Sequence, residues 1–331
     1  MVTMLDVAKR AGVSKATVSR VLSNPKVVDK HTRAHVRATI EELGYRPNAV
    51  ARGLASRSSR TVGVVINWFA SFYYGSLLDG AEHELASGGY KMLAESARER
   101  VDGEREAWTS LLERQCDAVI IHSDNLNDDE LGRWMTDHPK SVLMNRRLDQ
   151  FLDRCVYLDN SRGGALAAAH LYEKGHRDIA MVTGPAKFCE VRDRSFGFID
   201  YLQTRDLTAH VVESTFNDEG GYQAMQTVLD STPSCSAVFF QNDEMAAGAL
   251  ETCRERGIDV PNDVSMIGFD DIPTARHLTP KLTTVRQPLR DIGAAAGRLA
   301  LALAEEQVET NEIQRVFEAE LVERGSVLAC K

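Results

Sequence analysis

Hydrophobic positions near the N-terminus recur at helical spacing in two short runs. They lie on either side of a Gly12-Val13-Ser14 turn and comprise Leu5, Ala8, Val18, Val21 and Leu22. This spacing predicts two short helices. Gly12 can adopt the positive φ of a tight turn, and Ser14 is a favoured N-cap residue for the second helix. The pattern is typical of a helix-turn-helix.

A third amphipathic segment follows at residues 31–43. Val36, Ile40 and Leu43 share one of its faces, Asp29 is a candidate N-cap, and Gly44 ends the pattern. We expect the three helices to close a small core of their own. The sequence therefore predicts a helix-turn-helix domain over residues 1–46.

From residue 61 onward, short apolar runs alternate with longer amphipathic stretches. The expected buried strands are residues 61–66, 90–96, 118–122, 141–145, 178–184, 236–242 and 264–270, separated by helical segments such as 77–89, 166–176 and 244–257. This alternation is typical of doubly wound α/β sheets. Two cycles, over about 61–158 and 161–271, predict two similar α/β lobes in a domain of residues 61–331. We expect the segments after residue 282 to cross back and complete both lobes.

The net charge of −9 conceals an asymmetry between the two parts of the chain. The first 60 residues contain 12 Lys or Arg against four Asp or Glu, a net charge of +8, so the remainder carries −17. A basic N-terminal domain joined to an acidic body predicts a polyanionic partner for the former.

The start of the second helix carries the candidate DNA-reading side chains. In a helix-turn-helix these positions face base edges, which indicates Lys15, Ala16 and Arg20. Neighbouring hydroxyl groups can contact phosphates, here those of Ser14, Thr17 and Ser19. The alternative is that the charges are merely solvated on a helical hairpin. The charge excess and the spacing together favour double-stranded DNA.

Residues 47–60 begin as a short helical pattern and end as a Ser/Arg-rich linker. The helical part is too short to be stable alone, so we expect it to form a hinge helix only on DNA and beside a second copy. Asn48 is a candidate DNA contact, and Leu54 could wedge between base steps from the minor groove. A plain linker with an incidental leucine is the alternative.

Polar and aromatic side chains follow several predicted strands, where ligands of open α/β sheets bind. They combine carboxylate, amide, guanidinium and aromatic groups, which suit a sugar. The candidate effector contacts are Tyr73, Tyr74, Asn145, Arg194, Phe216, Asn242 and Asp270. Structural alternatives stay open, with Asp270 and Asn242 as caps, Phe216 as core and Arg194 as a surface ion pair. His122, directly after a strand, could also touch a ligand.

Composition and motifs exclude several classes of protein. No run of 18 apolar residues could span a membrane, and no apolar stretch marks a secretory signal, so a cytoplasmic protein is expected. The sequence lacks phosphate-binding loops, dinucleotide-binding turns, nucleophile elbows and metal-binding histidine patterns, and its six cysteines form no C-x-x-C pair. We therefore expect no cofactor, no metal and no enzymatic activity.

The string LDVAKRAGVSKATVSRVL, with TVGVVI, VSMIGFDD and LTTVRQP, resembles the LacI/GalR family of transcriptional regulators over essentially the whole chain. Within the family, the likeness is to repressors of β-glucoside (asc-type) operons. The resemblance implies a body of periplasmic-binding-protein type, base reading by Lys15, Ala16 and Arg20, and a hinge helix with Leu54 as its wedge.

For the body, the resemblance implies that Arg194, Asn242 and Asp270 are the principal effector contacts. It implies pocket walls formed by Tyr73, Tyr74, Asn145 and Phe216. A homodimeric repressor on a pseudo-palindromic operator is then expected, with a sugar or glycoside inducer. Two alternatives stay open: a purine or nucleoside corepressor on the same fold, and a sugar-binding enzyme with an appended DNA-binding head.

Overall fold

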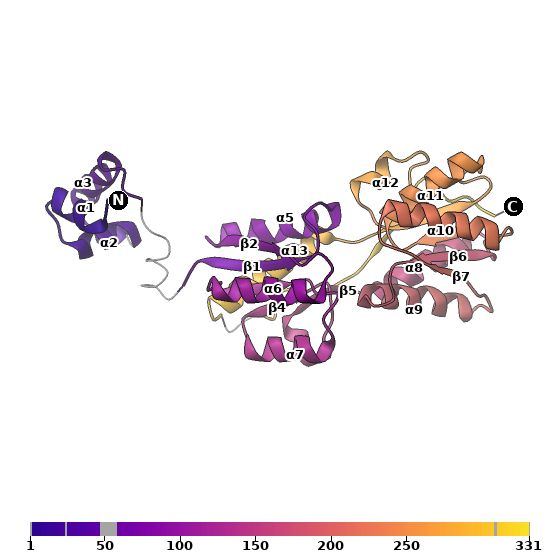
Figure 1. The fold of residues 1–331 in the computed structure, drawn as a ribbon, viewed down its shortest axis with the longest axis horizontal. Coiled ribbons are helices and arrows are strands. Elements are labelled where there is room, and N and C mark those ends of the chain that lie inside the picture. The colour runs from indigo at the N-terminus through magenta and orange to yellow at the C-terminus, as the bar shows by residue number, and fades with distance from the viewer. Residues whose placement is uncertain (1, 24, 47–57, 308–309, 331) are drawn as a thin grey trace. The chain divides into compact units, whose positions relative to one another are not determined.

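The computed structural model describes residues 2–23, 25–46, 58–307 and 310–330. Contacts divide the chain into two compact units, Met1–Ser59 and Arg60–Lys331 (Figure 1). The expected hinge helix, with Asn48 and Leu54, lies outside the described residues. Within the described ranges, no helix combines the length and the apolar character needed to cross a membrane.

The first unit is a small bundle of short helices. Its elements are α1 (Met4–Arg10), α2 (Lys15–Ser23), the 3-10 turn η1 (Pro25–Val27) and α3 (Lys30–Glu42). Gly12 has the expected positive φ of 63°, and the Ser14 hydroxyl accepts a hydrogen bond of 3.1 Å from the Thr17 backbone N–H. Asp29 caps α3 by accepting from two backbone N–H groups. The predicted helix-turn-helix and third helix are thus confirmed.

The three helices pack against one another through one buried face each. Val7 of α1, Val18 and Val21 of α2, and Val36 of α3 are almost fully buried. Because α2 buries the face that carries Val18 and Val21, it leaves Lys15 and Arg20 exposed to solvent. The core therefore decides which side of α2 can meet a partner.

The first lobe of the body is a six-stranded parallel sheet with helices on both faces. Its strand order is β11-β5-β4-β3-β1-β2. The strands are β1 (Thr61–Ile66), β2 (Lys91–Ser96), β3 (Ala118–Ile121), β4 (Ser141–Met144), β5 (Cys155–Leu158) and β11 (Val316–Phe317). The helices are α5 (Phe72–Ser87), α6 (Val101–Glu113), α7 (Asp128–Asp137) and α13 (Leu289–Ala304), with the 3-10 segment η2 (Asp149–Arg154).

The second lobe repeats the same plan, with strand order β12-β10-β9-β8-β6-β7. The strands are β6 (Ile179–Thr183), β7 (His210–Glu213), β8 (Ala237–Phe240), β9 (Ser265–Asp270), β10 (Thr283–Arg286) and β12 (Glu320–Val322). The helices are α8 (Asn160–Glu173), α9 (Cys189–Gln203), α10 (Asp218–Ser231), α11 (Asp243–Arg256) and α12 (Pro273–His277). Only the β10–β12 pair in this sheet is antiparallel.

Three connections join the lobes (Figure 1). The chain passes from β5 to the second lobe, returns after β10 through α13 to β11, and crosses again to β12. The predicted pair of doubly wound α/β lobes is confirmed, as is the return of the chain after residue 282. The carboxyl ends of the strands supply the loops in which ligand-binding side chains are expected.

Helices α5 and α13, which are far apart in the sequence, pack backbone against backbone. A Cβ atom added to Gly80 would lie 2.0 Å from the carbonyl oxygen of Arg290. One added to Gly293 would lie 1.9 Å from the carbonyl oxygen of Leu77. Since neither carbonyl can move without shifting its helix, only glycine permits this approach.

This contact predicts opposite effects for two glycines of the same helix. Gly80→Ala should lower the free energy of unfolding by about 2 kcal/mol, because the added methyl group forces α5 and α13 apart. Gly75→Ala meets nothing within 4 Å and should raise that free energy by up to about 1 kcal/mol through helix propensity. Urea unfolding of the full chain, followed by tryptophan fluorescence, measures both. All three tryptophans lie in the body, and equal effects of the two substitutions would contradict the packing.

Candidate functional site

The first unit presents one side of α2 as a candidate nucleic-acid surface. Lys15, Ala16 and Arg20 are exposed on it, beside the Ser14 and Thr17 hydroxyls, which lie 2.9 Å apart. Ser19 is exposed on the same helix. Among the described residues, Lys15 and Arg20 form no ion pair, whereas Arg10 is held by Glu42 at 2.5 Å. Their charges are available to an anionic partner.

The body holds a cavity of about 380 Å³ lined by residues from both lobes. Six of the seven candidate effector residues line it: Tyr73, Tyr74, Arg194, Phe216, Asn242 and Asp270. Asn145 does not line this cavity; it lies behind Tyr73 and donates a hydrogen bond to the Tyr73 hydroxyl. The tertiary structure therefore brings together side chains that are up to about 200 positions apart in the sequence.

Arg194 in α9 is the only guanidinium among the residues that line this cavity, and it is almost fully buried. Its Nε donates to Asn160 Oδ1 and its Nη1 to the carbonyl oxygen of Gln241, both at 2.8 Å. The guanidinium lies 4.0 Å from the ring centroid of Phe269. These contacts fix the guanidinium plane and leave Nη2 as a donor for a ligand hydroxyl.

Asp270, the last residue of β9, and Asn242, in the turn between β8 and α11, both line the cavity. Asp270 has φ of 109°, a strained value for a residue other than glycine, and accepts a 2.6 Å hydrogen bond from Gln287 Nε2. Burial raises the pKa of Asp270 to about 7, against the opposing charge of Arg194. Asn242 caps α11 by accepting from the Met245 N–H at 2.8 Å. The capping interpretation of Asn242 therefore holds alongside its place in the cavity wall.

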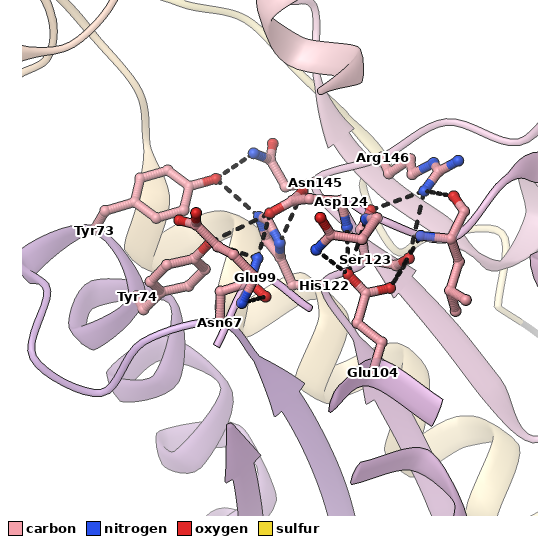
Figure 2. A network of polar contacts seen from close by, with 12 residues as sticks. Asn67, Tyr73, Tyr74, Glu99, Glu104, His122, Ser123, Asp124, Asn145 and Arg146 are labelled. Carbon is pink, nitrogen blue, oxygen red and sulfur yellow. Dashed lines mark hydrogen bonds and ion pairs between the residues drawn. The ribbon is translucent and has the colours of Figure 1, made fainter. Parts of the chain in front are cut away.

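Tyr73 and Tyr74 belong to a buried polar network in the first lobe (Figure 2). The Tyr73 hydroxyl lies 3.2 Å from His122 Nε2, and the Tyr74 hydroxyl donates to Asp124 at 3.4 Å. Asn67 donates to both Asp124 and the Tyr74 hydroxyl. These bonds hold the two phenol rings in an edge-to-face arrangement with centroids 5.0 Å apart.

His122 and Asp124 form an ion pair within this network, with 3.4 Å between Nδ1 and Oδ1. Burial lowers the pKa of His122, but the carboxylate of Asp124 outweighs it and leaves the pKa raised. Burial raises the pKa of Asp124, and the positive charge of His122 reverses that shift. Both directions describe an imidazolium beside a carboxylate.

Glu104 of α6 holds the loop that carries Asp124 (Figure 2). Its fully buried carboxylate accepts from the backbone N–H groups of residues 124, 125 and 126 and from the Ser123 hydroxyl, the last at 2.6 Å. Arg146 donates to the carbonyl oxygens of Ser123 and Leu126 from the other side. The loop is held between the carboxylate of Glu104 and the guanidinium of Arg146, which fixes the position of Asp124.

The first turn of α9 adds an acid that sequence reasoning missed. Glu190 lines the cavity with only 9% of its surface exposed, and among the described residues it forms no ion pair and no hydrogen bond to another side chain. Burial raises its pKa to about 7, and repulsion from Asp124 adds to the shift. No apolar periodicity or strand end marks this position, so the sequence offered no signal for it.

Aromatic rings complete the walls. Phe216 and Phe188 lie nearly parallel, at 9° with 6.1 Å between ring centroids, and Trp68 donates its indole N–H to Glu99 at 2.9 Å. Flat apolar rings beside carboxylates, amides and a guanidinium can bind a ligand that has an apolar face and several hydroxyl groups. In the part of the chain that is described, no group of three or more His, Cys, Asp or Glu could hold a metal ion.

Two segments of the chain match known families. Residues 3–48 match bacterial regulatory proteins of the lacI family, and residues 168–327 match a periplasmic binding protein-like domain. The transcriptional regulator GalR of Escherichia coli (strain K12) is 37% identical over 330 residues, which cover 99% of this chain and 96% of GalR. The regulator AscG of the same strain is 34% identical and covers 99% of both chains.

A transcriptional repressor and a solved structure are similar as well. The repressor PurR of Edwardsiella ictaluri (strain 93-146) is 34% identical, over 99% of this chain and 97% of PurR. The crystal structure of the lac repressor dimer bound to operator and the anti-inducer ONPF matches with a TM-score of 0.89 and 27% identity, over 99% of both chains. The expected resemblance to LacI/GalR regulators is confirmed, and AscG supports the likeness to asc-type repressors.

The raised pKa of Glu190 predicts a pH-dependent stability. The folded protein holds this proton with a pKa of about 7 against an ordinary value of 4.5, so stability falls as the pH rises between these values and stays lower above them. Glu190→Gln removes the energetic cost of burying an ionised carboxylate. It should raise the free energy of unfolding at pH 8 by about 1–3 kcal/mol. The gain should vanish below about pH 4.5. Chemical denaturation at several pH values measures it, with the exposed Glu106→Gln of α6 as control; a pH-independent gain would contradict the assignment.

Proposed function

The chain belongs to the lacI family of bacterial regulatory proteins, and we propose that it represses transcription by binding operator DNA under the control of a sugar or glycoside. One observation carries the proposal: a single chain joins an exposed basic helix to a cavity whose lining suits a polyhydroxylated ligand. In this proposal residues 1–46 bind DNA, residues 47–60 form the hinge, and residues 61–331 bind the effector and a second copy of the chain.

On DNA, α2 lies in the major groove. Lys15, Ala16 and Arg20 meet base edges, and the hydroxyls of Ser14, Thr17 and Ser19 meet phosphates. Asn48 and Leu54 remain predicted contacts of the hinge, with Leu54 as a wedge in the minor groove. A homodimer in the cytoplasm places two such helices on the half-sites of a pseudo-palindrome, because the symmetry of the dimer sets that of the operator.

In the body, the effector binds between the lobes. Arg194, Asn242 and Asp270 hydrogen-bond to its hydroxyls, and the rings of Tyr73, Tyr74 and Phe216 pack on its apolar face. Asn145 acts through the Tyr73 hydroxyl. An effector that binds one arrangement of the lobes more tightly shifts the protein toward it, and operator affinity changes by the corresponding coupling free energy.

A purine or nucleoside corepressor is the second candidate. The nearly parallel rings of Phe188 and Phe216 favour it, because such rings also suit a flat base. A corepressor would strengthen operator binding, whereas an inducer weakens it, so the sign of the response separates the two. We propose no enzymatic activity, in line with relatives that are transcriptional regulators and repressors. Turnover of a bound ligand would overturn that view.

The DNA-binding proposal predicts a symmetric binding site. Enrichment of a randomised duplex pool with the full chain should return an inverted repeat, and Lys15→Ala or Arg20→Ala should weaken binding to it by about 10- to 100-fold. Arg133→Ala removes an exposed charge from the body and should change affinity far less. Fluorescence anisotropy at fixed salt measures each affinity. Recovery of no preferred sequence, or of one without symmetry, would reject the proposal.

The effector proposal predicts that Arg194 is needed for the effector to bind and to change operator affinity. A thermal-shift screen of monosaccharides, disaccharides, glucosides and nucleobases first identifies the ligand, because a compound that binds the native state raises its stability. Arg194→Lys keeps the charge but loses the planar set of donors. It should lower the affinity for that ligand by about 10- to 100-fold. Operator affinity without ligand should persist. The exposed Arg192→Lys of the same helix is the control, and equal effects of both would contradict the role of Arg194.

A further inference from the structure

The cavity is strongly unbalanced in charge. Its lining contains five carboxylate side chains and one guanidinium, that of Arg194. The acids come from both lobes: Glu99, Asp124, Glu190, Glu244 and Asp270. A ligand held between the lobes therefore meets negative side chains on two sides.

Three of these acids have protein partners. Asp124 pairs with His122, Glu99 accepts from the Trp68 indole, and Asp270 accepts from Gln287 while lying within the field of Arg194. Arg194 donates to Asn160 and to the Gln241 carbonyl, and its Nη2 remains as a donor toward the cavity. This one guanidinium stands against five acids, so a bound anion would meet more negative than positive charge in the lining.

The other two acids stand without such partners. Among the described residues, neither Glu190 nor Glu244 forms an ion pair or a hydrogen bond to another side chain, and Glu190 is more than nine-tenths buried. Burial raises the pKa of Glu190 to about 7 and also raises the pKa of Glu244. Burial thus opposes the full negative charge of the cavity lining, and a bound anion would add to that energetic cost.

We infer that the effector of this cavity carries no negative charge: it is a neutral sugar or glycoside, or an amino derivative, and not a sugar phosphate or a sugar acid. The inference rests on the proposed function, because it specifies the chemical class of the effector bound at the same site. Neutral hydroxyl groups can donate to Glu190 and Glu244 and satisfy them, whereas a phosphate or carboxylate has acceptors only and repels them.

Matched sets of sugars test this with the full-length protein. D-glucose, D-galactose and methyl β-D-glucoside are each compared with the 6-phosphate and the uronic acid of the same ring by calorimetric titration at pH 7.5. For a ring that binds, the neutral member should bind at least about tenfold more tightly than its anionic forms, which corresponds to about 1.4 kcal/mol. Anionic forms that bind as tightly or more tightly would overturn the inference while leaving a sugar-controlled regulator intact. If no form of any ring binds, the same comparison is made on the sugar or glycoside that the thermal-shift screen identifies; a screen that identifies none rejects the proposed sugar effector, and the inference with it.

Removing one of the unpartnered acids should reduce the preference of the cavity for neutral over anionic sugars. Glu190→Gln should raise the affinity for the 6-phosphate relative to the neutral sugar by at least about threefold, since one repelling charge is gone while the shape is kept. The measured quantity is a ratio within one variant, so a uniform loss of affinity does not affect it. Glu244→Gln, at a half-buried position, is a second variant should the first fold poorly. Glu106→Gln, outside the cavity, should leave the ratio unchanged; an unchanged ratio in both cavity variants would overturn the inference.

Discussion

The buried guanidinium of Arg194 is the interaction on which the cavity depends most. A charge in the interior is tolerated only when hydrogen bonds and opposing charges surround it. Asn160 at the start of α8, the Gln241 carbonyl after β8 and the Phe269 ring of β9 supply that setting. By tying α9 to three other elements, Arg194 also fixes the first turn of α9, which carries Glu190.

The first lobe also contains a buried charge that hydrogen bonds must satisfy, in this case a negative one. The buried carboxylate of Glu104 is satisfied by the loop after β3, and Arg146 satisfies the carbonyl groups of that loop. The two clamps pre-form the walls before any ligand arrives, which lowers the ordering cost of binding. The cavity lining, however, includes two acids, Glu190 and Glu244, that form no ion pair among the described residues. A site with such unmet charge trades stability for ligand binding.

The elements with strong local signals were predictable. Buried strands such as β1, β8 and β9 are unbroken apolar runs, and the turn at Gly12 with the cap at Asp29 follows from residue type alone. Strands β5, β7, β10, β11 and β12 were not predicted, since each spans only two to four residues and none continues into a longer apolar run. Of the site, six residues followed from strand ends and family resemblance. Asn145 lies outside the cavity lining and donates to Tyr73, and Glu190 and Phe188 were missed because nothing local marks them.

The sequence by itself determined the order of helices and strands, the basic first part and acidic body, and the residue types available for DNA and for a hydroxylated ligand. These follow from spacing and composition, which act between near neighbours along the chain. Only the tertiary structure decided that α13 packs on α5, that acids from both lobes face one cavity, and which of them go unpaired. Such features arise between groups that lie far apart in the sequence, where burial and charge depend on the whole fold.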